Sequence, residues 1–269
     1  MYNRDRLEYK PLISIIIPTY KSESYIARTL ESLSEQTYKN FEVFIVNRGD
    51  IADLENICAK YKFCKVFRLD SERTKAINFG ARICNGDYIY YLPSDYVLEP
   101  TTLDEIVSVI RRDDPDAIII PNLIHESEGF WAKVKNVEKK AILNTNIEAA
   151  RFFKKDVFFK VGMYDENMIA YEEHDLHNRV KLLNYKICRL ERIGEYITNE
   201  PNLIGYIKKY YYYGKTINVF MKKNGKYSTH IMNPFRISSI PIRLLLPFIL
   251  YQLCRYSAAI IGFIVARMK

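Results

Sequence analysis

Apolar runs and helical patterns alternate along the first 120 residues. Residues 12–17 form a continuous apolar run that Pro18 closes, which is typical of a strand buried on both faces of a parallel sheet. Further strands are expected at residues 41–46, 65–69, 88–92 and 117–121, and helices at residues 22–36, 51–61, 74–84 and 101–111. This alternation, with its short connections, predicts a doubly wound α/β domain.

Ligands of such sheets bind beyond the carboxyl ends of the strands. Ligand-binding and catalytic residues are therefore expected in the loops that follow the strands. These loops are residues 18–20, 47–50, 70–73 and 93–96.

The second half of the chain departs from this rhythm. Residues 125–146 hold Trp131 and a Lys-rich helical pattern, which we interpret as a surface helix or a flap over a site. Strands at 151–153 and 186–190 and helices at 156–161 and 174–183 follow. The predicted organisation is an extension over 1–10, an α/β domain over 11–200 and a C-terminal region over 201–269.

Residues 244–266 form a mostly apolar stretch that is long enough to span a bilayer. Pro247 interrupts it, and Arg255 near its middle would cost about 2.5–3.5 kcal/mol on insertion scales. Two interfacial helices, over 240–250 and 252–266, avoid that cost, so we favour them over one spanning helix. A third interpretation is that the segment packs on the soluble domain.

The net charge of +8 favours an acidic partner: nucleic acid, anionic lipid or a phosphorylated ligand. Basic residues become denser between Lys208 and Lys226, directly before the apolar stretch, which indicates a membrane surface. No nucleic-acid-binding motif is present, so no nucleic-acid partner is expected. The charged N-terminus lacks the apolar run of a secretory signal.

The five cysteines are odd in number and form no CxxC pair. We therefore expect buried, reduced thiols in a cytoplasmic protein.

One carboxylate stands directly after the fourth predicted strand, in Pro93-Ser94-Asp95. An Asp in this place can hold Mg²⁺ or Mn²⁺ against a diphosphate, because these cations prefer oxygen ligands. A turn or a helix cap is the alternative. The loop at 47–50 offers polar groups to a base or ribose, with a turn at Gly49 as its alternative.

An acidic cluster of Glu172, Glu173 and Asp175 lies at the start of a predicted helix. A carboxylate held near like charges binds its proton more tightly, which suits a general base. The alternatives are helix capping and an i,i+4 pair between Asp175 and Arg179. His174 and His177 are three residues apart on the same predicted helix, a spacing that could bind a metal. No third metal ligand is evident, so solvated helix positions are expected for both.

Several common enzyme motifs are absent. The chain contains no GxGxxG, GxxxxGK[ST], GxSxG or HExxH motif, which removes the usual support for a dehydrogenase, a P-loop protein or a hydrolase.

Short motifs between about residues 12 and 190 resemble family-2 glycosyltransferases of the GT-A fold in order and spacing. They are Pro18-Thr19-Tyr20, Glu31-Ser32-Leu33, Gln36-Thr37-Tyr38, Phe41-Glu42-Val43, Asn78-Phe79-Gly80, Gly86-Asp87-Tyr88, Leu92–Asp95, Gly162–Glu166 and Glu172–Arg179. The resemblance implies a Rossmann-like, mostly parallel sheet flanked by helices, here with an apolar helical appendage at the C-terminus.

The resemblance also implies a site for a nucleoside-diphosphate sugar. Its expected residues are Pro18, Thr19, Tyr20, Glu23, Asn47, Arg48, Lys75, Asn78, Ser94, Asp95 and Arg179. Asn47 stands where the family has a base-contacting Asp, and Lys75 and Asn78 where it approaches the diphosphate and sugar.

The implied mechanism is inverting. Glu173 corresponds to the family's catalytic Asp, with Glu172 and Asp175 in the same acidic cluster. Glu173 would remove the acceptor proton, and Asp95 would hold Mg²⁺ or Mn²⁺.

Two departures from the family pattern bear on the expected metal dependence. Asn47-Arg48 replaces an Asp pair, and Pro93 replaces the first Asp of the DxD motif, so one expected ligand is lost. Arg48 brings a guanidinium, which binds phosphate well. We therefore expect weakened or altered metal dependence.

The sequence thus predicts a glycosyltransferase at the cytoplasmic face of a membrane, peripheral or held by a single C-terminal anchor. Its expected acceptor is lipid-linked or an envelope glycan. The alternative is a non-catalytic glycosyltransferase-like binding or assembly protein, which Pro93, Asn47 and Arg48 favour and Asp95 and the acidic cluster oppose.

Overall fold

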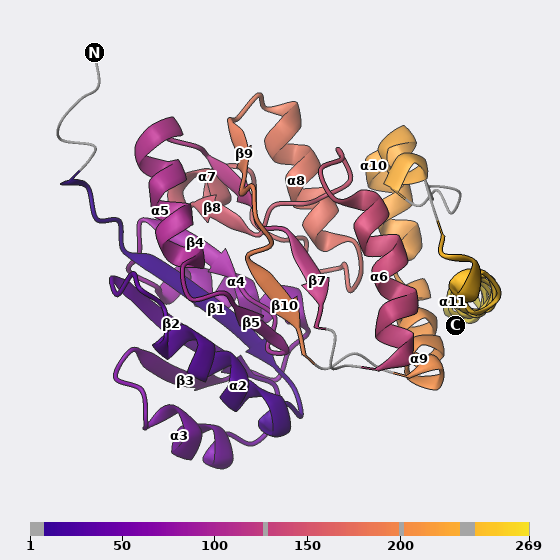
Figure 1. The fold of residues 1–269 in the computed structure, drawn as a ribbon, viewed down its shortest axis with the longest axis horizontal. Coiled ribbons are helices and arrows are strands. Elements are labelled where there is room, and N and C mark those ends of the chain that lie inside the picture. The colour runs from indigo at the N-terminus through magenta and orange to yellow at the C-terminus, as the bar shows by residue number, and fades with distance from the viewer. Residues whose placement is uncertain (1–7, 126–128, 199–201, 232–239, 269) are drawn as a thin grey trace.

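A mixed seven-stranded sheet forms the centre of the molecule (Figure 1). The computed structural model describes residues 8–125, 129–198, 202–231 and 240–268. In spatial order the strands are β3 (Cys64–Arg68), β2 (Phe41–Asn47), β1 (Ile13–Thr19), β4 (Tyr88–Tyr91), β8 (Phe152–Lys154), β6 (Ala117–Ile119) and β9 (Ile187–Arg189). Only β8 runs antiparallel to its neighbours, which confirms the predicted mostly parallel sheet.

Helices cover both faces of this sheet because successive residues of a strand point to opposite sides. Ile15 and Ile17 enter one core, Ile16 enters the other, and all three are fully buried. The covering helices are α2 (Glu23–Ser34), α3 (Ala52–Cys58) and α5 (Thr102–Asp113) on the first face, and α4 (Arg73–Ile83), α7 (Lys155–Lys160) and α8 (Glu172–Leu182) on the second.

A second sheet, of three strands with three residues each, was not predicted. Its order is β5 (Tyr96–Leu98), β10 (Glu195–Ile197) and β7 (Asn122–Ile124). A buried ion pair between Arg151 and Glu195, which also accepts the Tyr90 hydroxyl, ties it to the larger sheet. The backbone N–H of Thr198, just past β10, donates to the Asp95 carbonyl at 2.8 Å, which fixes the loop between β4 and β5.

The C-terminal helices gather at one edge of the molecule (Figure 1). They are α9 (Leu203–Gly214), α10 (Ile217–Ile231) and α11 (Ile242–Arg267), and α6 (Phe130–Ile142), from the middle of the chain, packs against α11. The prediction of two helices after residue 240 is wrong, since α11 runs unbroken past Pro247. Arg255 forms an ion pair with Glu138 of α6, so the lone charge that argued for a break has a partner.

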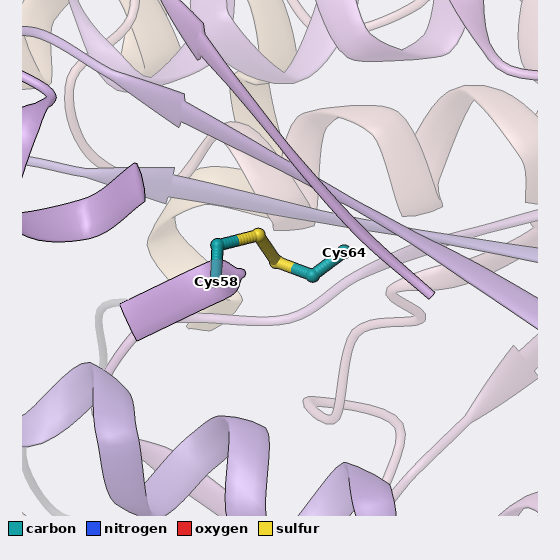
Figure 2. Close-up of a disulfide and its surroundings, with 2 residues drawn as sticks. All are labelled: Cys58 and Cys64. Atoms are coloured by element: carbon teal, nitrogen blue, oxygen red, sulfur yellow. A yellow bond between two sulfur atoms is a disulfide. The ribbon is translucent and has the colours of Figure 1, made fainter. Parts of the chain in front are cut away.

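Cys58, at the end of α3, and Cys64, at the start of β3, form a disulfide (Figure 2). The turn at residues 59–63 brings the helix end and the strand start together, with 5.6 Å between the two Cα atoms. The expectation of reduced thiols is therefore wrong for this pair. Cys84, Cys188 and Cys254 are free, and burial raises the pKa of the Cys84 thiol.

Gly86 allows β4 to lie close against β1. A Cβ atom at residue 86 would lie 2.5 Å from Ser14 Oγ and 2.7 Å from the Leu12 carbonyl oxygen. The backbone of β1 cannot move aside without disturbing its ladders, so Gly86→Ala should lower the free energy of unfolding by about 1–3 kcal/mol. Urea titration of Gly49→Ala is the control, because its Cβ would meet only Asn47 Nδ2 at 3.7 Å. Equal stability of both variants would contradict this packing.

Candidate active site

Two cavities meet beyond the carboxyl end of β4. The strand-end cleft, of about 450 Å³, is lined by residues that follow β1, β2 and β4. The inner cavity, of about 270 Å³, lies between the loop after β4 and the start of α8. Arg73, Tyr91, Pro93 and Asp95 line both, so these four residues mark the junction of the two cavities.

The strand-end cleft gathers many of the residues predicted to bind a nucleotide sugar. They are Pro18, Thr19, Tyr20, Arg48, Ser94 and Asp95. Asn47 does not line the cleft: it is buried, and its Oδ1 accepts the Thr19 hydroxyl at 3.0 Å. The Asn47 amide also donates to the Asp50 carbonyl, so this side chain holds two loops of the cleft in place.

Arg48 brings positive charge to the mouth of the cleft. Its guanidinium lies 5.5 Å from the centroid of the Tyr20 ring. It pairs with Glu72 at 2.9 Å and with Asp70 at 3.3 Å, and these carboxylates raise the pKa of Arg48. The neighbouring acids thus hold a permanently charged donor beside an exposed ring.

Arg73, the first residue of α4, stands at the junction of the two cavities. Its Nη2 lies 2.5 Å from Glu172 Oε1 and donates to the Ile169 carbonyl at 3.0 Å. Although burial opposes the charge, Glu172 raises the pKa of Arg73. Its Nε is buried and has no hydrogen-bond partner in the described part of the chain. Arg73 was not among the predicted site residues, yet it belongs to the loop at 70–73 where chemistry was expected.

Two adjacent acids of α8 have different surroundings. Glu172 is only 2% exposed and is paired with Arg73. Glu173 is half-buried, and among the described residues it forms no ion pair. It lines the inner cavity and also a third cavity of about 180 Å³. Glu172 therefore positions Arg73, while Glu173 offers its carboxylate to the inner cavity.

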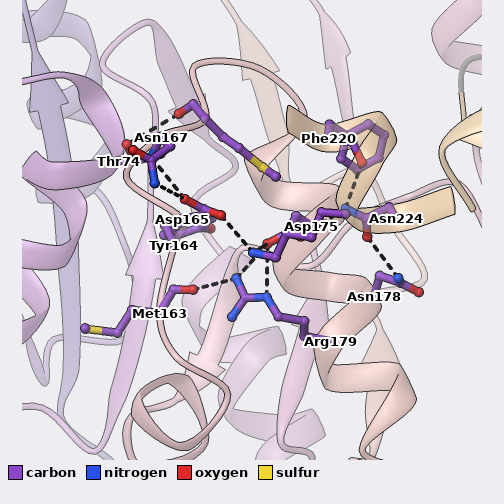
Figure 3. A network of polar contacts seen from close by, with 12 residues as sticks. Thr74, Met163, Tyr164, Asp165, Asn167, Asp175, Asn178, Arg179, Phe220 and Asn224 are labelled. Carbon is purple, nitrogen blue, oxygen red and sulfur yellow. Dashed lines mark hydrogen bonds and ion pairs between the residues drawn. The ribbon is translucent and has the colours of Figure 1, made fainter. Parts of the chain in front are cut away.

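Asp175 and Arg179 form part of a polar network that links α8 to α10 (Figure 3). Asp175 is fully buried, lies 2.8 Å from Arg179 and 3.1 Å from Lys223, and accepts the Asn224 amide at 3.0 Å. Arg179 also donates to the carbonyls of residues 161 and 163. Neither residue lines the strand-end cleft or the inner cavity, and the expected i,i+4 pair between them is present.

Two other predicted residues, Asn78 and Lys75, also line neither cavity, and the side chain of a third, Glu23, lies outside the described residues. Asn78 is buried, and its amide exchanges hydrogen bonds of 2.9 and 3.1 Å with the backbone of Tyr164. Lys75 is exposed and lines neither cavity. Glu23 begins α2, but its side chain lies outside the described residues.

The C-terminal helices complete the walls of both cavities. Lys209, Tyr210 and Tyr213 of α9 and Arg255 of α11 line the inner cavity. Tyr212 lines the strand-end cleft, and its hydroxyl donates to Glu72 at 2.6 Å. Sequence patterns had placed these residues in a separate membrane-associating region, because no local signal relates α9 to the sheet.

Asp95 is the carboxylate at the junction that fits a divalent metal. The described residues contain no group of three or more His, Cys, Asp or Glu side chains arranged for a metal ion. Mg²⁺ commonly keeps several waters and takes only one or two protein carboxylates when it is bound together with substrate phosphates. A single Asp at this place is compatible with that mode of binding.

The model of glycosyl transferase family 2 matches residues 14–164, more than half of the chain. The chain belongs to this family. An uncharacterized glycosyltransferase of Rickettsia typhi is 27% identical over 184 residues, covering 62% of this chain and 58% of that protein. An uncharacterized glycosyltransferase of Haemophilus influenzae is 26% identical over 231 residues, covering 74% of this chain and 77% of that protein. The chain thus spans less than three fifths of its Rickettsia typhi relative.

Solved structures share the fold of this chain. S. aureus TarS residues 1–349 superpose with a TM-score of 0.61 at 17% identity, over 93% of this chain and 80% of that one. The mannosyltransferase PcManGT from Pyrobaculum calidifontis, in complex with GDP-Man and Mn²⁺, gives 0.59 at 12% identity, over 97% of this chain and 74% of that one. The predicted GT-A fold is confirmed.

The two histidines of α8 are less solvated than the sequence predicted. His177 is only 6% exposed, and its Nδ1 accepts the backbone N–H of Ala150 at 3.2 Å. The Nδ1 of His174 is buried without a partner in the described residues. Burial lowers the pKa of each to about 4, so both are neutral in the folded protein at pH 7.

Acid should therefore destabilise the protein through His177. Between pH 6.5 and 4 the unfolded chain binds a proton that the folded chain excludes, so stability is full above pH 6.5 and falls as the pH approaches 4. The loss from His177 should reach at most about 3 kcal/mol. His177→Asn keeps an acceptor but does not titrate, and urea unfolding across this range should show a shallower pH slope. Identical slopes for variant and wild type would contradict the assignment.

Proposed function

We propose that this protein transfers a sugar from a nucleoside-diphosphate sugar to an acceptor hydroxyl, with inversion. The donor would occupy the strand-end cleft and the acceptor the inner cavity. The observation that carries the proposal is that both cavities share Arg73 and Asp95, while Glu173 lines the inner cavity and not the strand-end cleft. Solved relatives of the fold are described in complex with UDP-GlcNAc and with GDP-Man, which supports this class of donor.

The strand-end cleft suits a nucleoside diphosphate in size and chemistry. Its volume of about 450 Å³ lies within the range of small-molecule sites. Tyr20 is 54% exposed and offers an aromatic face to a base. Arg48 beside it can bind a phosphate through two N–H donors.

Glu173 is the proposed general base. Its carboxylate would take the proton of the acceptor hydroxyl, and the oxygen would attack the anomeric carbon as the bond to the diphosphate breaks. The diphosphate leaves with the electron pair of that bond, on the side opposite the attack, which inverts the anomeric centre. The absence of an ion pair to Glu173 in the described residues supports this role, because a paired carboxylate is a weaker base.

Arg73 and Asp95 would serve the leaving diphosphate. The Nε of Arg73 has no partner among the described residues, and Glu172 keeps the guanidinium charged and fixed at the junction. Asp95 would hold Mg²⁺ or Mn²⁺, which when bound neutralises developing charge on the phosphate oxygens. Two arginines in the cleft, Arg48 and Arg73, add positive charge that does not depend on a metal.

The proposed acceptor is lipid-linked or an envelope glycan, and the proposed location is the cytoplasmic face of a membrane. Residues 201–269 contain 11 Lys and Arg and no Asp or Glu, although the whole chain is only +8. Such a segment is attracted to the anionic cytoplasmic leaflet. The free Cys84, Cys188 and Cys254 agree with a reducing compartment, whereas the Cys58–Cys64 disulfide is unusual there.

Replacing the proposed base should separate catalysis from donor binding. Glu173→Gln should lower turnover in a nucleotide-sugar transfer or hydrolysis screen by about 10²–10⁴-fold, because the amide cannot accept the proton. Calorimetric affinity for UDP or GDP should stay unchanged, since Glu173 does not line the strand-end cleft. Glu31→Gln, on the exposed face of α2, is the matched control.

Full turnover in Glu173→Gln would exclude this residue as the base. A wild-type protein that binds nucleotide sugars but shows no turnover with any of them would favour the non-catalytic alternative.

Metal dependence should be partial. In excess EDTA the wild type should keep measurable turnover, because Arg48 and Arg73 still face the diphosphate. Arg73→Met should lower the turnover that remains in EDTA by at least about tenfold, as expected for removal of one charge-assisted contact. Measuring it in a Glu172→Gln background avoids an unpaired buried carboxylate. Complete loss of wild-type turnover with EDTA and saturable rescue by Mn²⁺ would contradict the prediction.

A further inference from the structure

α11 is apolar on two opposite faces. Its buried residues Phe248, Tyr251, Ala258 and Gly262 recur at helical spacing and face α6 and α9. The opposite face is apolar and open, and its most exposed side chains are Ile242 (84%), Leu246 (76%) and Leu253 (63%). Large side chains exposed in such a continuous stripe mark an interaction surface.

The buried face is joined to the enzyme along its length. A Cβ atom at Gly214 of α9 would lie 2.1 Å from the Ala259 carbonyl oxygen, and one at Gly262 would lie 2.0 Å from the Tyr211 carbonyl oxygen. The backbones of α9 and α11 are therefore in direct contact at two places. Such close crossings depend on glycine and would be lost if α11 left the domain.

Polar contacts hold the middle of α11 in the same place. Arg255 pairs with Glu138, which also pairs with Lys135 at 2.7 Å. The hydroxyls of Tyr251 and Tyr210 lie 3.0 Å apart. A helix of 26 residues is about 39 Å long and can span a bilayer, but a spanning α11 would carry Arg255 into the hydrocarbon without Glu138.

The charge of the C-terminal region and of the two ends of α11 indicates the partner. The 69 residues from 201 to 269 carry 11 basic and no acidic residues. Arg243 and Arg267, at the two ends of α11, are both exposed. An apolar stripe flanked by cations fits the interface of an anionic bilayer, where apolar side chains enter the acyl region and cations meet headgroups.

We propose that α11 lies in the plane of an anionic membrane, with its open face in lipid and its other face on the enzyme. The proposal rests on the membrane association proposed above and decides between an in-plane and a spanning helix. Arg255, on the same helix, lines the inner cavity together with Lys209 and Tyr210. The proposed acceptor site is therefore built partly by α11. An acceptor held at the lipid surface can then reach Glu173 without leaving that surface.

Labelling from one side of a sealed vesicle tests the orientation of α11. Arg243→Cys and Met268→Cys are made in the full chain with Cys188→Ser and Cys254→Ser, and bound to phosphatidylcholine vesicles containing phosphatidylglycerol. An in-plane helix exposes both ends on the outside, so a membrane-impermeant maleimide should label both equally before and after detergent. Labelling of residue 268 only after detergent would show a spanning helix and overturn the proposal.

Vesicle co-sedimentation tests the docking face itself. Leu246→Glu with Leu253→Glu should lower the bound fraction at least tenfold, while Leu182→Glu, 71% exposed on α8, should leave it unchanged. Circular dichroism checks that each variant is folded. Equal binding of all proteins would overturn the proposed face. Absence of wild-type binding would overturn membrane docking altogether, whereas the proposed transfer reaction is judged separately by Glu173→Gln.

Discussion

The ion pair between Arg73 and Glu172 organises the candidate active site. It joins the start of α4 to the start of α8, two helices that cover the same face of the sheet. Burying Glu172 without Arg73 would leave an uncompensated carboxylate in the core, so each residue fixes the other. The pair therefore gives adjacent acids different roles: Glu172 positions a cation, and Glu173 faces the inner cavity.

The two sheets supply the frame on which this pair acts. The parallel strands bring the loops after β1, β2 and β4 to one edge, and the Arg151–Glu195 pair fixes the short sheet beside them. Helices α9 and α11 then close the inner cavity from outside the sheet. The proposed donor cleft depends on the α/β layers, while the proposed acceptor side depends on the C-terminal helices.

Sequence patterns predicted the strands and helices of the α/β layers because apolar runs such as residues 12–17 are buried on both faces. They also placed Thr19, Arg48 and Asp95 in one cleft. They did not separate residues that build the fold from residues that line the cavities: Asn78, Asp175 and Arg179 are engaged in structural hydrogen bonds and ion pairs. Arg73 and Arg255 were not assigned to the site, because their roles arise from contacts between elements distant in sequence.

The crystal structure of this protein with bound UDP or GDP tests the central claim most directly. The nucleoside is expected between Thr19 and Arg48, the diphosphate within hydrogen-bond distance of Arg73 and close to Asp95, and Glu173 facing the inner cavity, free of nucleotide. A diphosphate bound away from Arg73, or a nucleotide that fills the inner cavity beside Glu173, would contradict it.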